Sequence, residues 1–209
     1  MTAEYNSERY AVINRWDPSH LEKIDRLLDL QPGDRVLEIG CGQGHLTKRL
    51  ADRGIDITGI DANPNASHIS ESERVVYMRA EALQFDDGVF DSIISVHAIE
   101  HIPDLKGAFA EMARVLKAGG KALFIYPAEP IMGLYAIPTA VILHKNPFMA
   151  RKIHCQKLTP KKVLMMLGPH GFEERHREFN LIKSPQFVSV LEKVTGGARA
   201  ERPVDQENG

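Results

Sequence analysis

The chain has 209 residues, of which 43% are hydrophobic and 26% are charged, and its formal net charge is -2. This is enough apolar material for one core, and the small net charge excludes the global basic field that binds nucleic acid. Two cysteines are too few for a disulfide framework, and the polar first ten residues lack a signal-peptide core. The longest uncharged apolar run, residues 131–143, is shorter than the roughly 20 residues that span a bilayer. We therefore expect one domain over residues 1–195, a disordered polar tail at 196–209 and a cytoplasmic location.

The predicted elements begin with a helix from Leu21 to Leu30, where apolar residues recur at helical spacing after the candidate caps Asp17 and Ser19. Short apolar runs then alternate with longer stretches, which indicates βαβ units and a parallel sheet. These runs are Val36–Ile39, Ile55–Ile60, Arg74–Met78, Phe90–Val96 and Lys121–Tyr126. A helix is predicted from about Asp104 to Lys117, ended by Gly119-Gly120. The last predicted elements are a helix from Thr159-Pro160 to Leu167 and a strand near Phe172–Phe179.

A glycine loop with the sequence Gly40-Cys41-Gly42-Gln43-Gly44 joins the first predicted strand to a helix. Glycine permits both a tight turn and the close approach of backbone to a ligand. The third glycine comes one residue too early for the G-x-G-x-x-G fingerprint that binds a pyrophosphate, and Glu38 precedes the loop. Asp61 follows the second strand, where a carboxylate can accept both hydroxyls of an adenosine ribose. Loop and acid together predict a nucleoside cofactor and disfavour an NAD-dependent oxidoreductase.

Four segments resemble the class I S-adenosylmethionine-dependent methyltransferases, especially the ubiquinone-biosynthesis type: LEIGCGQGHL, GIDAN, FDSIISVHAIEHI and EMARVLKAGGKALF. The resemblance spans about residues 31–126 and implies a Rossmann-like α/β fold, with a seven-stranded, mostly parallel sheet and helices on both faces. It implies that S-adenosylmethionine is the cofactor. Arg79 stands where the family commonly has an acid that reaches the adenine, so Ala80 and Glu81 are the expected substitutes. The full set of implied cofactor contacts is Glu38, Gly40, Cys41, Gly42, Gly44, Asp61, Ala62, Ala80, Glu81, Ser95, Val96 and His97.

His97, Glu100 and His101 form an H-x-x-E-H segment after the fourth strand. A zinc-peptidase interpretation is rejected, because the segment follows a buried strand in a nucleotide-binding context and has no third ligand. The segment resembles an E-x-x-E-H that is thought to hold a divalent cation in ubiquinone-type O-methyltransferases. Imidazole suits magnesium poorly, so we predict no metal. A neutral histidine could remove the acceptor proton, with His101 the first candidate base and His97 the second, although packing alone explains either histidine equally well.

The acceptor side is predicted to involve an apolar insertion at residues 127–157, after the fifth strand, where α/β sheets place their ligand crevice. Its uncharged part favours a hydrophobic acceptor, a membrane-facing patch or a subunit contact, and a plain buried helix is equally compatible. Between residues 144 and 177 there are eight Lys or Arg and two acids. This excess suits peripheral contact with the anionic inner face of a membrane or a substrate with an acidic group and an oily tail, and a solvated face is also compatible. Residues 1–30 are predicted to form a lid and a helix over the cofactor.

The leading hypothesis is methyl transfer from S-adenosylmethionine to a small, largely apolar acceptor at oxygen: a phenol, quinone precursor, lipid or secondary metabolite. A non-catalytic S-adenosylmethionine-binding partner or sensor module is the alternative. No nucleic-acid partner is expected, and the sequence leaves the oligomeric state open.

Overall fold

The computed structural model describes residues 17–128, 155–181 and 185–194. Its strands are β1 (Arg35–Ile39), β2 (Asp56–Asp61), β3 (Val75–Tyr77), β4 (Phe90–Val96), β5 (Leu116–Pro127), β6 (Phe172–Asn180) and β7 (Gln186–Lys193). Its helices are α2 (Ser19–Leu28), α3 (His45–Ala51), α4 (Ala66–Ile69), α5 (Leu105–Val115) and α8 (Pro160–Leu167), with 3-10 turns η1 (Ile99–His101) and η3 (Gly168–His170). Within these ranges one seven-stranded sheet has the order β3-β2-β1-β4-β5-β7-β6. Strands β1 to β5 are parallel, and β7 is antiparallel to both of its neighbours.

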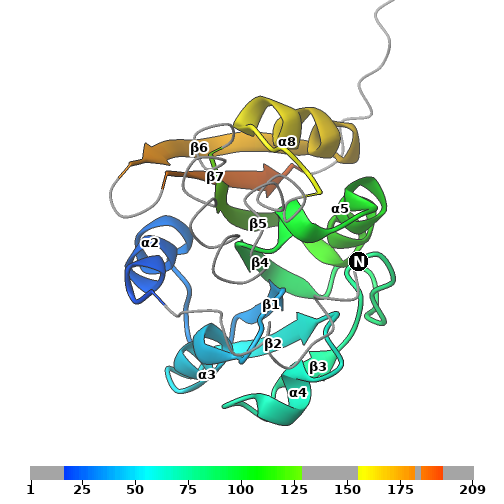
Figure 1. Cartoon of the computed structure of the whole chain (residues 1–209). Coiled ribbons are helices and arrows are strands. Elements are labelled where there is room, and N and C mark those ends of the chain that lie inside the picture. Colours follow the sequence, from blue (N-terminus) through cyan, green and yellow to red (C-terminus); the bar gives the residue numbers. More distant parts are fainter. Residues whose placement is uncertain (1–16, 129–154, 182–184, 195–209) are drawn as a thin grey trace, which may run out of the picture.

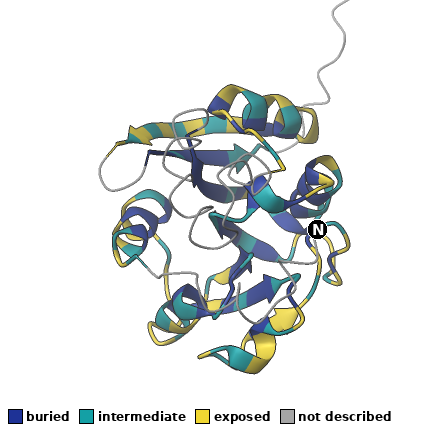
Figure 2. Ribbon diagram, in the orientation of Figure 1, coloured by how far each residue is buried: buried dark blue, intermediate teal, exposed yellow. Residues whose placement is uncertain are grey.

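The sheet separates two hydrophobic cores, because alternate residues of its strands face opposite sides. Val36 and Ile94 pack with α2 and α3, whereas Leu37 and Ile93 pack with α5 and α8. Figure 1 shows this division, with α2 and α3 on one face of the sheet and α5 and α8 on the other. The central strands are buried along most of their length (Figure 2), as expected for a parallel sheet covered on both faces. The predicted α/β class and seven-stranded sheet are thus confirmed.

The predicted helices and strands occur within a few residues of their expected ends. Thr159 caps α8 by accepting a hydrogen bond from the Lys162 backbone N–H, and Asp104 caps α5 in the same way through Gly107. The residue before α2 is Pro18, which makes no side-chain cap, although the carboxylate of Asp17 accepts the Ser19 N–H at 3.0 Å.

Two details differ from the sequence-based expectation. The helix ends at Val115, and Gly119-Gly120 lies inside β5 instead of ending the helix. The chain enters the sheet early because Leu116 already pairs with Phe90, and an irregularity in the pairing accommodates the following residues. Strand β7 was not located from the sequence.

Within the described ranges, no helix combines the length and apolar character needed to cross a bilayer. Residues 1–16 of the predicted lid, most of the predicted insertion (129–154) and the predicted tail at 196–209 lie outside the described residues. The carboxyl ends of the parallel strands meet at one edge of the sheet, and this edge carries the residues described next.

Candidate functional site

The glycine loop leaves the carboxyl end of β1 and is tied to the end of β2. The backbone N–H groups of Gly40 and Cys41 both donate to the carbonyl oxygen of Ile60, at 2.8 and 3.0 Å. Gly40, Gly42 and Gly44 have φ angles of 73°, 52° and 72°, in the left-handed region where a side chain is strained. A Cβ at Gly40 would overlap the Cβ of Ala98, so the loop also lies directly against the segment after β4.

Asp61, the last residue of β2, is hydrogen-bonded to the glycine loop. One carboxylate oxygen accepts the Gly42 N–H at 2.9 Å, and the other accepts the Asn63 N–H at 2.8 Å. Burial raises the pKa of Asp61 above its ordinary value, and these two hydrogen bonds offset part of that rise. Because each oxygen has two acceptor positions, each can still accept one further hydrogen bond. The side chain therefore fits the paired hydroxyls of an adenosine ribose, and the bare glycine backbone fits a ligand at close range.

Glu38 is buried near the end of β1, with 4% of its surface exposed. Its carboxylate accepts a 2.6 Å hydrogen bond from the Thr47 hydroxyl of α3. Burial raises the pKa of Glu38 to about 7, opposed by the Thr47 hydrogen bonds and reinforced by the charge of Asp61. This carboxyl group therefore changes its charge close to neutral pH.

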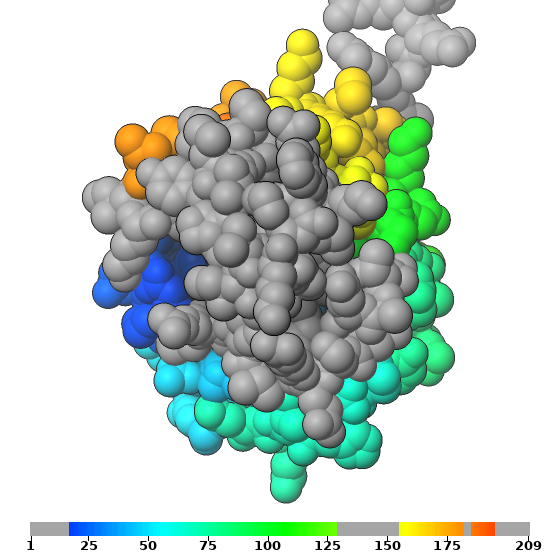
Figure 3. All heavy atoms as spheres, in the orientation of Figure 1, coloured from blue at the N-terminus to red at the C-terminus, as the bar shows by residue number. Residues whose placement is uncertain are grey.

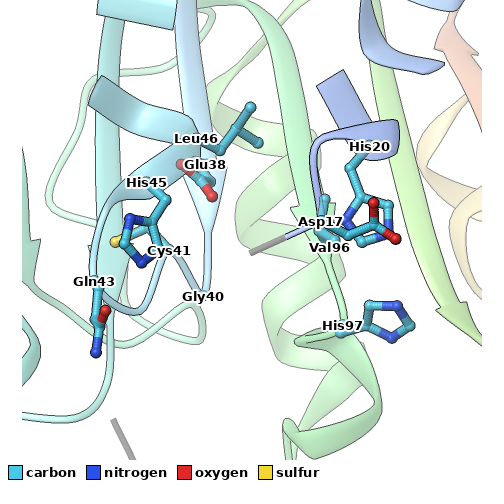
Figure 4. Close-up of a pocket in the computed structure, with 10 residues that line it drawn as sticks. All are labelled: Asp17, His20, Glu38, Gly40, Cys41, Gln43, His45, Leu46, Val96 and His97. Carbon is cyan, nitrogen blue, oxygen red and sulfur yellow. The ribbon is translucent and has the colours of Figure 1, made fainter. Parts of the chain in front are cut away.

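A small pocket, open to solvent, joins the loop to α2 and to the end of β4. Figure 4 shows the loop residues on one side and Asp17, His20 and His97 across from them. In the space-filling view, α2 and α8 lie at the left and upper edges of this face (Figure 3). The lining residues are Asp17, His20, Glu38, Gly40, Cys41, Gln43, His45, Leu46, Val96 and His97.

His97 has a left-handed backbone, with φ 52°, which is uncommon for a residue with a side chain. Its Nε2 lies 3.0 Å from Oε1 of Gln186, and its Nδ1 lies 3.6 Å from Oε1 of Glu100. Burial alone would lower the pKa of His97, but the hydrogen bond and charge of Glu100 raise it above its ordinary value. The His20 ring lies 5.6 Å from the His97 ring, and burial followed by the His97 charge lowers the pKa of His20 to about 4.

The other predicted site residues fall into two places. Ser95 and Val96 lie at the end of β4, where the Ser95 hydroxyl donates to the Ile39 carbonyl at 3.1 Å. Arg79 forms a 2.9 Å ion pair with Glu81 beyond β3. Ala80 is buried and Ala62 is half-buried. Of these residues only Val96 lines the described pocket. The other five lie outside the lining set, and so does His101, whose Nε2 is 3.8 Å from the Glu100 carboxylate.

No cluster of three or more His, Cys, Asp or Glu side chains that could hold a metal ion occurs among the described residues. The two histidines and Glu100 are arranged instead as ion pairs around a single carboxylate oxygen.

Sequence reasoning missed the contributions of His20, Gln186, Gln43 and His45 to the site. One signal was available for His20, which precedes the buried Ile24 by four residues and so shares its helix face. His45 follows the glycine loop directly, and its Nδ1 lies 3.0 Å from the Glu71 carboxylate. Gln186 offered no signal, because its role depends on the pairing of β7 with β5.

The family model described as a methyltransferase domain matches residues 37–124. The phosphoethanolamine N-methyltransferase 2 of Caenorhabditis elegans is 37% identical over 114 residues, which are 50% of this chain and 26% of that protein. The ubiquinone biosynthesis O-methyltransferase of Aromatoleum aromaticum is 34% identical over 127 residues, 56% of this chain and 54% of that protein. The chain thus spans between about a quarter and a half of the length of these curated relatives.

Solved structures share the fold at low identity. The [4+2]-cyclase SpnF has a TM-score of 0.69 and 18% identity, over 85% of this chain and 81% of that one. A sarcosine dimethylglycine methyltransferase from Galdieria sulphuraria has a TM-score of 0.65 and 15% identity, over 84% and 83%. Residues 37–124 match the methyltransferase-domain model, and the glycine loop and the strand order agree with a class I S-adenosylmethionine-dependent methyltransferase fold.

Proposed function

We propose that this chain transfers a methyl group from S-adenosylmethionine to an oxygen atom of a small, largely apolar acceptor. The observation that carries the proposal is the pocket that the glycine loop and His97 line together. The loop and Asp61 provide the donor side. His97 provides a group that can hold a proton next to it.

The donor side fits its cofactor through residues that are already held in place. Asp61 retains acceptor positions for the ribose, and the absence of side chains at Gly40 and Gly44 lets the loop pack closely against Ala98, Ser70 and Val75. When bound, S-adenosylmethionine supplies a methyl group on a sulfonium, which is a good leaving group. The protein therefore has mainly to align donor and acceptor, and such alignment is worth roughly 7–11 kcal/mol.

On the acceptor side, His97 is the better-placed base. It lines the pocket, whereas His101 does not belong to that lining set. A base with a pKa near the working pH adds roughly 10²–10⁴-fold to the rate of removing a hydroxyl proton. The apolar character of the acceptor is inferred from the uncharged run at residues 131–143, which lies outside the described residues.

The test is transfer of label from methyl-labelled S-adenosylmethionine to a panel of phenols, catechols, long-chain alcohols, carboxylic acids and amines. Mass spectrometry of the products would identify the acceptor atom. We expect O-methylation of an apolar hydroxyl compound, with a large loss of rate in His97→Gln and a smaller one in His101→Gln. Turnover of amines alone would contradict the proposal.

The second candidate, a non-catalytic S-adenosylmethionine-binding partner or sensor, is favoured by the Arg79–Glu81 ion pair at the expected adenine position. A likeness in fold does not decide between the two, because the [4+2]-cyclase SpnF shares this fold. Calorimetric binding of S-adenosylhomocysteine without turnover of any acceptor on the panel would favour the sensor. Binding of NADH in its place would contradict both candidates.

Contact with an anionic membrane surface is a separate, finer proposal, supported by part of the basic run. Arg175 and Arg177 pair with acids on β6 and β7, so they contribute little net charge. The run also contains Lys161 and Lys162, which lie at the start of α8. They are close in sequence to Met165 on the same helix, an apolar side chain that is 67% exposed. These two lysines are the positions to alter in a liposome assay.

A further inference from the structure

Glu100 is a buried carboxylate that the proposed chemistry does not yet use. Only 2% of its surface is exposed, and among the described residues its Oε2 atom has no hydrogen-bond partner. Its other oxygen, Oε1, faces Nδ1 of His97 at 3.6 Å and Nε2 of His101 at 3.8 Å. Burying a carboxylate costs free energy unless the group is paired, so the position of Glu100 is explained by its two histidine partners.

The backbone around Glu100 is fixed from two sides. Its carbonyl oxygen accepts hydrogen bonds from the Gln156 N–H at 3.0 Å and from the Cys155 thiol at 3.4 Å. His97 begins the same turn in a left-handed conformation, a strained geometry that persists only where the surroundings impose it. Nδ1 of the His97 ring faces Oε1 of Glu100 and Nε2 faces Oε1 of Gln186, while His97 itself belongs to the pocket lining.

We propose that Glu100 is a positioning residue that accepts the Nδ1 proton of His97 and thereby makes Nε2 the nitrogen that takes the acceptor proton. This inference rests on the proposed function. In the step, the acceptor O–H bond breaks and its proton goes to Nε2, while the oxygen gains the methyl group and the sulfonium becomes a neutral thioether. The positive charge thus moves from sulfur to the His97 ring, next to the carboxylate of Glu100.

Gln186 suits both protonation states of this ring. Its amide has an oxygen that accepts and a nitrogen that donates, and a half-turn about its last bond exchanges the two. With the oxygen toward Nε2, as in the structure, it matches the charged ring. With the nitrogen toward Nε2, it matches the neutral ring. Gln186 can therefore hydrogen-bond to both the neutral and the charged His97 ring, and it does not fix the ring in one protonation state.

The polar and titratable groups around His97 favour a positive charge on the His97 ring. Glu100 and His101 approach from η1, Asp17 and His20 from the start of α2, and the neutral Gln186 from β7. Burial alone would raise the pKa of Glu100, but the hydrogen bond and charge of His97 and the charge of His101 hold it below its ordinary value. The pKa of His20 is lowered to about 4, so His20 stays neutral beside the charged pair.

The first test uses NMR on the full chain without cofactor. The ring-nitrogen shifts of His97, assigned by comparison with His97→Gln, report which nitrogen keeps the proton in the neutral ring. We expect the Nδ1–H form. A neutral His97 that carries its proton on Nε2 overturns the proposal. The position of the proton is measured on the wild-type chain, and His97→Gln serves only to assign the signals.

The second test replaces Glu100→Gln, which removes the charge and keeps the size. The ratio of charged to neutral His97 at a given pH should fall about tenfold or more, the effect of losing a carboxylate within about 4–6 Å. The matched control is Glu71→Gln, which removes the carboxylate that lies 3.0 Å from His45 in the same pocket. A change at His97 no larger in Glu100→Gln than in this control overturns the proposal.

The third test is the pH profile of methyl transfer with an acceptor found on the panel. Glu100→Gln should move the acidic limb to lower pH together with the His97 titration and reduce the plateau of kcat/KM about 10²-fold or more. A uniform loss of rate with an unmoved limb indicates a merely structural role for Glu100. If no acceptor is turned over, the proposed function fails, whereas both NMR tests still decide whether Glu100 directs the His97 proton.

Discussion

The contact between the glycine loop and the segment after β4 can be tested by Gly40→Ala. In the folded chain the new methyl group would overlap the Cβ of Ala98, whose Cα is 3.6 Å away. The backbone φ of Gly40 is 73°, which disfavours any residue with a Cβ. The substitution therefore imposes two separate costs, one from the backbone and one from the collision.

The left-handed backbone costs about 1–2 kcal/mol for a non-glycine residue, and overpacking costs about 1–3 kcal/mol, so Gly40→Ala should lose about 2–5 kcal/mol of unfolding free energy. Gly88→Ala is the matched control, because Gly88 has φ 61° and nothing within 4 Å of the added methyl group. It should show the backbone cost alone, about 1–2 kcal/mol.

Urea unfolding of the two single variants and of Gly40→Ala combined with Ala98→Gly would measure these costs. Removing the Ala98 methyl leaves its Cα in ordinary contact with the new side chain, so the double variant should recover the collision cost of about 1–3 kcal/mol. Equal losses in Gly40→Ala and Gly88→Ala, or no recovery in the double variant, would refute the claim that the loop is seated against Ala98.

Asp61→Asn should weaken S-adenosylhomocysteine binding at least about tenfold in calorimetry, since hydrogen bonds to a charged group are worth about 1.5–3 kcal/mol. The control is Asp56→Asn, at the exposed start of β2, which should leave this affinity unchanged. Burial raises the pKa of Glu38 from 4.5 to about 7 in the folded chain, so the contribution of Glu38 to stability is fully present below pH 4.5 and is lost as pH rises through 7. Glu38→Gln should remove this loss, on the order of 3 kcal/mol, and an unchanged pH dependence of urea unfolding would count against it. Anionic liposomes at low salt should retain the chain but not a Lys161→Glu/Lys162→Glu variant; equal retention of both would dismiss membrane contact.

The donor side of the site was predictable because its parts are local in sequence. A strand, a glycine loop and the following helix occupy one continuous segment, and Asp61 ends the adjacent strand of the same βαβ unit. Neighbouring parallel strands place their carboxyl ends side by side, so the spacing alone brings Gly42 next to Asp61. The same reasoning gives the alternation of β1, β2 and β4 residues between two cores.

Strand β7 escaped prediction because a polar residue interrupts its apolar pattern. Val188 and Val190 face one core and Leu191 faces the other, while the buried Ser189 lies between them. The Ser189 hydroxyl is satisfied by the Tyr126 hydroxyl at 2.9 Å, a partner 63 positions earlier in the chain. A buried serine hydroxyl needs a hydrogen-bond partner, and the sequence of the strand alone does not reveal that Tyr126 provides it.

The acceptor side has the same non-local character, which explains why the order of the two histidines could not be derived from their spacing. His97 and His101 are equivalent in the H-x-x-E-H pattern, and both contact Glu100. The structure distinguishes them, because His97 has a left-handed backbone and contacts Gln186 of β7 and His20 of α2. The polar environment of His97, the proposed base, is thus built by three elements distant in sequence. A relative that keeps this histidine but alters α2 or β7 would keep the motif and lose the geometry.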